Sequence, residues 1–199
     1  GAGAKPEQAK AIAIAERAYQ KAVAYARDRV QSRPVDGSMN KSAPIVHHPD
    51  IKRMLMTMRA YTEGCRAMSI VAAAAFDAAH HHADAEVRKH NNAFYEFMVP
   101  LVKGFSTEMS LDVASLGVQV HGGMGYIEET GAAQHYRDAR IAAIYEGTNG
   151  IQAIDLVTRK LPLNGGETVK AFIRELRETA GRVKAANDPA FGATAARLS

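Results

Sequence analysis

The sequence predicts an all-α fold, an up-and-down helical bundle, and three observations support this prediction. Hydrophobic residues make up 47% of the 199-residue chain, and many of them are alanine, which favours helix over sheet. Apolar residues recur at spacings of three and four over long stretches, as in amphipathic helices. Glycine- and proline-rich segments separate these stretches, and no convincing strand pattern occurs. These features indicate three or four long helices packed together.

The first half of the chain contains two of the expected helices. One covers about residues 6–30, with an apolar stripe that includes Ile12 and Ala22. A loop rich in Pro, Gly, Ser and Asn follows at residues 32–44. The second helix starts at Asp50, a good N-cap, and keeps helical spacing for about eight turns, which is about 45 Å. A helix of this length belongs in a long bundle.

A third helix is expected over about residues 92–120. Pro100 and Gly104 should kink this helix or mark its true start. Residues 124–147 are broken by glycine, and we expect a loop there with a short helix near residues 132–138. This stretch ends the regular part of the bundle.

The remaining chain predicts two further helices. A fourth helix should start near Asn149, and a fifth should cover about residues 167–186. The last residues resemble the first turns of another helix. We expect residues 1–7 to be a tag remnant or a disordered end.

Composition excludes several classes of protein. The net charge is +4, and basic and acidic residues alternate along the helices, so we see no nucleic-acid-binding stripe. The single Cys65 excludes an internal disulfide framework and fits a reducing compartment. No apolar run approaches the roughly 20 residues of a membrane span, and no signal peptide is visible. These features are typical of a cytoplasmic protein.

Histidines give the first candidate for chemistry. His80, His81, His82 and His90 could suggest a metal site. However, consecutive helical residues point in directions about 100° apart, and charged residues surround this cluster. A solvated helix end is the better interpretation, so we predict no metal site.

Glycines and an arginine give the second candidate. In "QVHGGMG", Gly122 and Gly123 follow Gln119 and leave the backbone unshielded, so a phosphate or another ligand could approach it closely. Ordinary helix termination explains them equally well. Arg29, at the end of the first helix, could complement the helix dipole or meet a phosphate. Spacing alone does not decide between these alternatives.

An acidic residue gives the third candidate. Glu146 lies in "YEGTNG", between Tyr145 and Gly147. Gly147 would leave Glu146 open to a ligand, and Thr148 is a natural N-cap for the next helix. The alternative is an ordinary carboxylate ahead of a helix N-terminus, where the dipole favours a negative charge.

Several motifs together resemble a known family. The segment "VQVHGGMGYIEETGAAQHYRDARIAAIYEGTNGIQ" resembles the C-terminal signature of the acyl-CoA dehydrogenases, and "ERAYQKAVAYARDRVQSR" resembles the first helix of their C-terminal domain. The resemblance covers residues 12–160. It implies that residues 8–161 form the C-terminal helical bundle, and that residues 162–199 begin the extra helical segment of a larger subgroup. The chain would then be a fragment that lacks the family's N-terminal helical and middle β domains.

The resemblance also implies an activity. Members of the family use FAD to convert an acyl-CoA thioester to a trans-2-enoyl-CoA, and a base removes the Cα proton while a hydride leaves Cβ. Glu146 falls on the position of that catalytic base, with Gly147 and Tyr145 beside the substrate. Electron-transferring flavoprotein is the implied electron acceptor, and a homodimer or homotetramer is the implied assembly. The location would be the cytoplasm, or the mitochondrial matrix in a eukaryote.

Cofactor contacts carry over from the family in two groups. Thr148 and Gly150 would contact the FAD of the same subunit. The second group would contact the FAD of a neighbouring subunit, and it comprises Arg29, Gln119, Gly122 and Gly123. We expect the isolated fragment to be inactive and to bind no FAD.

This chain departs from the family pattern at three positions. Ser32 and Arg33 stand where many members have an aromatic residue and a glycine, and Gly150 stands where many have a polar side chain. Two alternatives therefore stay open. The chain could belong to a catalytically inert paralogue that binds FAD or associates with DNA, or it could act only as a structural and oligomerisation module.

Overall fold

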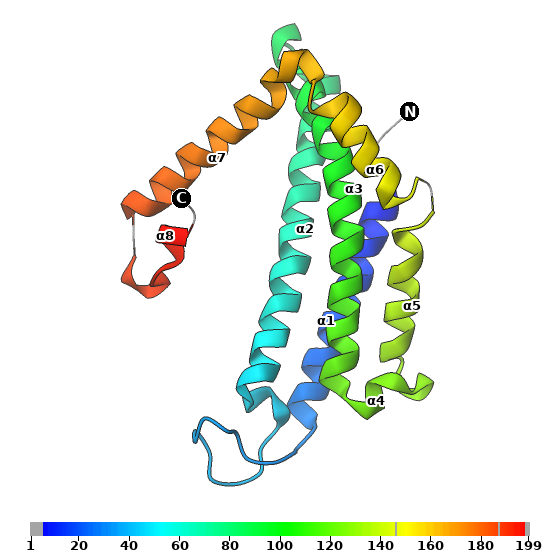
Figure 1. Ribbon diagram of the computed structural model, residues 1–199, viewed down its shortest axis with the longest axis vertical. Coiled ribbons are helices and arrows are strands. Elements are labelled where there is room, and N and C mark those ends of the chain that lie inside the picture. The colour runs from blue at the N-terminus through cyan, green and yellow to red at the C-terminus, as the bar shows by residue number, and fades with distance from the viewer. Residues whose placement is uncertain (1–5, 146, 187, 198–199) are drawn as a thin grey trace.

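The computed structural model describes residues 6–145, 147–186 and 188–197. Within these ranges the fold is all-α, which confirms the class predicted from the sequence, and the β pairing found there is an isolated bridge between Val30 and Pro44. Four helices pack side by side in an up-and-down bundle with α3 at its centre (Figure 1). They are α1 (Pro6–Asp28), α2 (Pro49–His81), α3 (Ala85–His121) and α5 (Ala132–Ala142).

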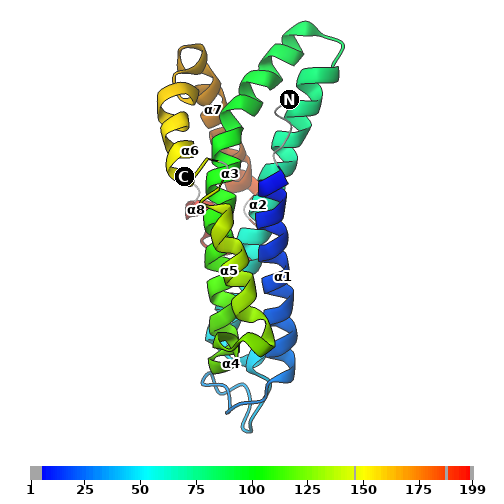
Figure 2. The same ribbon diagram turned by 90° about the vertical axis from the view of Figure 1, so that its right-hand side faces the viewer.

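Short elements connect these helices, and a further series of helices follows α5. The connecting elements are η1 (Ile45–His47), α4 (Gly123–Tyr126) and η2 (Glu128–Thr130). The extension consists of α6 (Asn149–Asp155), the π-helical η3 (Leu156–Lys160), η4 (Leu163–Gly166), α7 (Glu167–Ala186), η5 (Pro189–Phe191) and α8 (Thr194–Arg197). The α6–η3 segment lies against α3, whereas α7 runs away from the bundle (Figures 1 and 2).

The expected N-terminus of α2 was wrong in detail. The helix begins at Pro49, the N-cap position belongs to His48, and no side chain caps the first turn there. Proline is favoured in the first turn because its missing N–H would be unsatisfied anyway. Asp50 lies inside the first turn and pairs with Arg53 at 2.8 Å. Its carboxylate therefore complements the helix dipole without capping the helix.

The expected start of α3 near residue 92 was also wrong. The helix begins at Ala85, because Asp84 Oδ1 accepts a hydrogen bond from the Glu86 backbone N–H at 2.8 Å. This N-cap starts the helix ahead of the apolar stripe, so periodicity alone places the start too late. Pro100 lies inside α3 and does not end it. The N-terminal part of α3 leans away from the rest of the helix (Figure 2).

Two hydrophobic clusters form the core. The first joins α1, α2, α3 and α5, and the α1 side chains in it are alanines, which let the helices approach closely. Its buried members are Ala15, Ala18, Ala22, Ala26, Met54, Leu55, Met58, Val113, Ala114, Val120, Ala139 and Ile45 of η1. The second lies between α2 and the first half of α3. Its buried members are Ala72, Ala75, Tyr95, Phe97, Met98 and Val102.

Phe172 attaches α7 to the second cluster. Its ring centroid lies 5.6 Å from that of Phe94 and 5.8 Å from that of Phe97, within the range of favourable aromatic pairs. Leu176, one turn later, is 52% exposed. The contact between α7 and the bundle is therefore confined to the start of α7.

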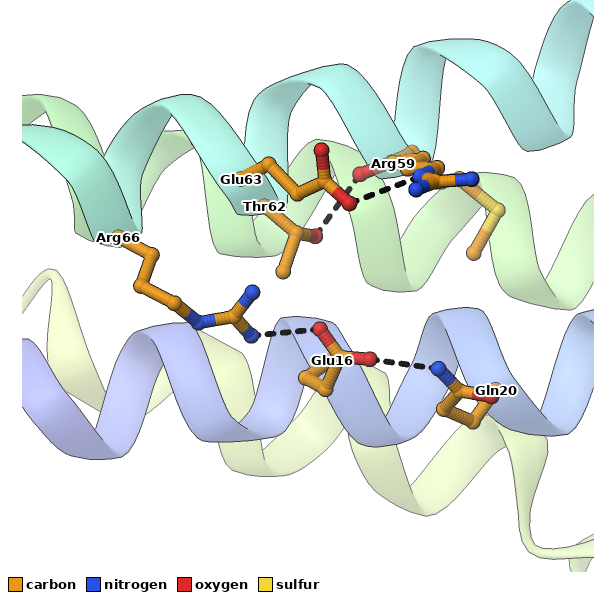
Figure 3. A network of polar contacts seen from close by, with 7 residues as sticks. Glu16, Gln20, Arg59, Thr62, Glu63 and Arg66 are labelled. Carbon is orange, nitrogen blue, oxygen red and sulfur yellow. Dashed lines mark hydrogen bonds and ion pairs between the residues drawn. The ribbon is translucent and has the colours of Figure 1, made fainter.

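Polar contacts also tie α1 to α2 (Figure 3). Arg66 Nη2 lies 2.6 Å from Glu16 Oε2, and Gln20 Nε2 donates to Glu16 Oε1 at 2.7 Å. The hydrogen bond from Gln20, together with that from Arg66, lowers the pKa of the Glu16 carboxyl. Along α2, Arg59 pairs with Glu63 at 2.8 Å. Because Arg66 and Glu16 are partly exposed, their pair contributes only about 0.2–1 kcal/mol, so the apolar core contributes more to stability.

Candidate functional site

The predicted site residues fall into two groups that lie apart along α3. One group, with Arg29 and Gln119, lies at the end of the bundle where α1 and α3 finish. The other follows α5 and packs against the middle of α3 at Lys103. A rise of 1.5 Å per residue places Lys103 about 24 Å from Gln119 along the helix.

Most of the first group lines a groove of about 330 Å³, which we call the Arg29 groove, whereas Gly123 lies next to its lining residue Gly122 in the sequence and does not line it. Arg29, at the end of α1, and Gln119 and Gly122, at the end of α3, all line it and are exposed. Ser32 also lines it. The structure thus brings together three residues that the sequence placed at two separate helix ends.

A stacked pair of rings lines one side of the Arg29 groove. The rings of Tyr25 and His121 are stacked with centroids 4.4 Å apart. His121 is buried, and its Nδ1 donates to the Gly117 carbonyl at 2.7 Å. Burial lowers the pKa of His121, and the positive charge of Lys21 lowers it further. The hydrogen bond to Gly117 and the stacked Tyr25 ring hold the His121 ring in a defined orientation.

Three glycines follow α3, and the physical reason for a glycine differs from one position to the next. Gly122 adopts φ +59°, a backbone conformation that favours glycine. A Cβ on Gly125 would lie 2.3 Å from the Val118 carbonyl oxygen, so packing requires glycine there. A Cβ on Gly123 would meet nothing within 4 Å, and its φ is not in the left-handed region. The described residues therefore do not explain why position 123 is a glycine. A molecule that approaches the backbone from outside would explain it.

The second group forms the loop between α5 and α6. Glu146, the predicted catalytic base, lies outside the described residues. Thr148 is the N-cap of α6, because its Oγ1 accepts from the Gly150 N–H at 3.4 Å, and this confirms its predicted capping role. Gly147 adopts φ +86°, and a Cβ there would lie 3.1 Å from Gln152 Nε2. The backbone conformation therefore favours glycine at position 147, and a Cβ there would make a tight contact with Gln152.

Side chains of α3 hold this loop and the start of α6. Asn149 Oδ1 accepts from Thr107 Oγ1 at 3.0 Å, and Asn149 Nδ2 donates to Glu108 Oε1 at 2.7 Å. Lys103 Nζ donates to the carbonyls of Tyr145 and Gly147. Lys103 was not among the predicted site residues, although a lysine within the apolar run "MVPLVKGF" is an unusual feature that could have identified it.

Other polar residues near the motifs have structural roles. Arg137 pairs with Glu128 at 3.7 Å and also donates to Gln134. His80 bonds the Phe76 carbonyl at 2.8 Å and lies over the Phe76 ring. Among the described residues, no group of three or more His, Cys, Asp or Glu side chains could hold a metal ion. Nor does the described part of the chain contain a helix long and apolar enough to cross a membrane.

A larger hollow of about 590 Å³ lies between the start of α3 and α7. Its lining includes Glu86, Lys89, Glu167 and Arg174, and none of the predicted site residues. Size alone therefore does not identify the functional site in this chain.

Known proteins resemble this chain in sequence over most of its length. The family described as "Acyl-CoA dehydrogenase, C-terminal domain" matches residues 8–161. A 3-methylmercaptopropionyl-CoA dehydrogenase of Ruegeria pomeroyi is 57% identical over 86% of this chain. A broad-specificity linear acyl-CoA dehydrogenase of Mycobacterium tuberculosis is 36% identical over 85% of it. This chain belongs to the acyl-CoA dehydrogenase C-terminal domain family.

Solved structures agree with this assignment. The butyryl-CoA dehydrogenase of Megasphaera elsdenii matches 76% of this chain and 34% of its own, with a TM-score of 0.56 and 28% identity. The apo-form of Bd2924 matches 85% of this chain and 31% of its own, with a TM-score of 0.72 and 24% identity, a likeness of fold alone. The chain spans only 29% and 28% of the length of the Ruegeria and Mycobacterium relatives.

Proposed function

We propose that this chain is the C-terminal part of an FAD-dependent acyl-CoA dehydrogenase in which Glu146 removes the Cα proton of an acyl-CoA thioester. The main support for this proposal is the position of residues 145–148 in the fold. In a chain that belongs to this family, the segment Tyr145-Glu146-Gly147-Thr148 stands in a loop whose described residues are fixed to the central helix α3. A fixed backbone is what a base needs to meet a specific proton.

The chemistry explains the residue types in this loop. The Cα proton next to a thioester is weakly acidic, so the base must be a carboxylate whose basicity its surroundings raise. In our proposal the thioester lies against the backbone at Gly147. Tyr145 is half-buried beside it and completes the proposed substrate contact. Proton removal from Cα together with hydride loss from Cβ leaves a trans-2-enoyl-CoA.

The Arg29 groove fits the diphosphate of FAD. Arg29 offers a guanidinium suited to phosphate oxygens, Gln119 offers amide donors, and the exposed Gly122-Gly123 backbone allows close approach. Thr148 and Gly150 are exposed at the start of α6, where they would contact the flavin end. A bound flavin would supply the acceptor for the hydride from Cβ.

The separation of the two groups supports a site shared between subunits. In our proposal Thr148 and Gly150 contact the FAD of their own subunit, whereas Arg29, Gln119, Gly122 and Gly123 contact that of a neighbour. The protein would then be a homodimer or homotetramer, and electron-transferring flavoprotein would reoxidise the flavin. Residues 8–161 would form the domain that does this, and residues 162–199 would begin a further helical segment.

A substrate panel tests the proposed function. The full-length protein is assayed with an artificial electron acceptor and acyl-CoAs of several lengths, with 3-methylmercaptopropionyl-CoA and linear acyl-CoAs included because the two relatives above carry those names. We expect acceptor reduction and 2-enoyl-CoA formation with at least one of them. A flavin-containing protein that turns over none of the panel would instead be an inert FAD-binding paralogue.

A further inference from the structure

Lys103 is a charged residue in an unusual place. It lies in the middle of α3, is only 2% exposed, and follows the buried Val102. Lysine is almost never buried unless its charge is partnered, because removing an ammonium from water is costly. The position of Lys103 therefore calls for a specific role of its ammonium group.

The contacts of Lys103 converge on one short segment. Nζ donates to the carbonyl oxygen of Gly147 at 2.6 Å and to that of Tyr145 at 3.1 Å. These are the residues immediately before and after Glu146 in the sequence. Gln152 Nε2 also donates to the Gly147 carbonyl, at 3.2 Å. The ammonium has three donor hydrogens on a compact head, so it can hold two carbonyls at once.

We propose that Lys103 is a positioning residue for the dehydrogenation, which fixes the backbone on both sides of the catalytic base. The inference rests on the proposed function of Glu146. Because α3 is the central helix of the bundle, Lys103 ties the loop to the most constrained element of the fold. Hydrogen bonds to two carbonyls around one residue restrict the backbone torsions that aim its side chain.

The test compares two lysine variants of the full-length protein. Lys103→Met removes the charge and the donors but keeps an unbranched side chain. Lys160→Met is the matched control, because Lys160 also joins the C-terminal segment to α3, through an ion pair with Glu96 that does not involve residues 145–147. The measurements are the flavin content, kcat, KM for acyl-CoA, and the kinetic isotope effect on kcat with substrate deuterated at Cα.

We expect Lys103→Met to retain flavin and to lose about 100-fold in kcat, the scale of a misplaced catalytic group. KM should change less than about threefold, because the loss concerns the transition state more than substrate binding. The isotope effect should rise, since proton removal becomes the slow step. Lys160→Met should match the wild type in all four measurements.

Two results would overturn the inference. One is a kcat within about threefold of the wild type in Lys103→Met, and the other is a lower kcat with an unchanged isotope effect, which indicates general damage to the fold. If Lys103→Met does not fold, Gln152→Leu, which removes the second donor to the Gly147 carbonyl, must raise the isotope effect for the inference to stand.

Glu146→Gln in the same assay separates the two proposals. An inactive Glu146→Gln beside a normal Lys103→Met overturns only the role of Lys103, whereas an active Glu146→Gln overturns both.

Discussion

Replacing Glu146 with glutamine in the full-length protein is expected to lower kcat by about 10²–10⁴-fold, the range of a lost general base. Glutamine has nearly the same shape as glutamate but cannot take up the Cα proton. Flavin content should stay at the wild-type level, because no predicted FAD contact changes. The measurement is acyl-CoA-dependent acceptor reduction, together with the flavin absorbance of the purified variant.

Glu129→Gln is the matched control for this prediction. Glu129 is an exposed carboxylate within η2, ahead of α5. It should retain full activity, since it belongs to neither group of site residues. Turnover at the wild-type rate in Glu146→Gln would remove Glu146 from the mechanism and leave the family fold without an assigned base.

Replacing Arg29 with alanine is expected to weaken FAD binding by about 10–100-fold, the scale of hydrogen bonds to a charged group. Arg29 lines the groove beside Gln119 and Gly122, so its guanidinium is placed to meet a phosphate. The full-length variant should lose most of its flavin during purification and recover activity when FAD is added in excess. Flavin titration by fluorescence measures the affinity directly.

Arg33→Ala provides the control for Arg29. Arg33 is also exposed and follows in the same stretch of sequence, but it does not line the groove. Its replacement removes the same charge from the protein and should leave FAD affinity unchanged. Equal losses in the two variants would mean that net charge, and not the groove, controls binding.

The main features of the fold could be predicted because they depend on local pattern. Alanine-rich stripes predicted the long helices, and Thr148 predicted the start of α6. The Arg29 groove also follows from topology. In an up-and-down bundle the first and third helices run in the same direction, so the ends that carry Arg29 and Gln119 must lie together. Periodicity could not predict the start of α3, because the N-cap at Asp84 determines it.

Lys103 shows why part of the site was missed. Its partners are the carbonyls of Tyr145 and Gly147, more than 40 residues away in the sequence, and backbone carbonyls carry no sequence signature. Only the packing of the loop onto α3 reveals why a lysine occupies an apolar stripe. The catalytic role of Glu146 and the FAD contacts stay predictions that follow from the family resemblance.

We propose above that the two groups of residues serve the flavins of different subunits. Co-expression of two differently tagged full-length variants, Arg29→Ala and Glu146→Gln, followed by purification on both tags, yields hybrid oligomers. In each symmetric pair, one site then combines Glu146 and Thr148 of one subunit with Arg29 of the other. We expect turnover of about half the wild-type value per hybrid dimer at limiting FAD. A hybrid as inactive as its two parents would contradict it.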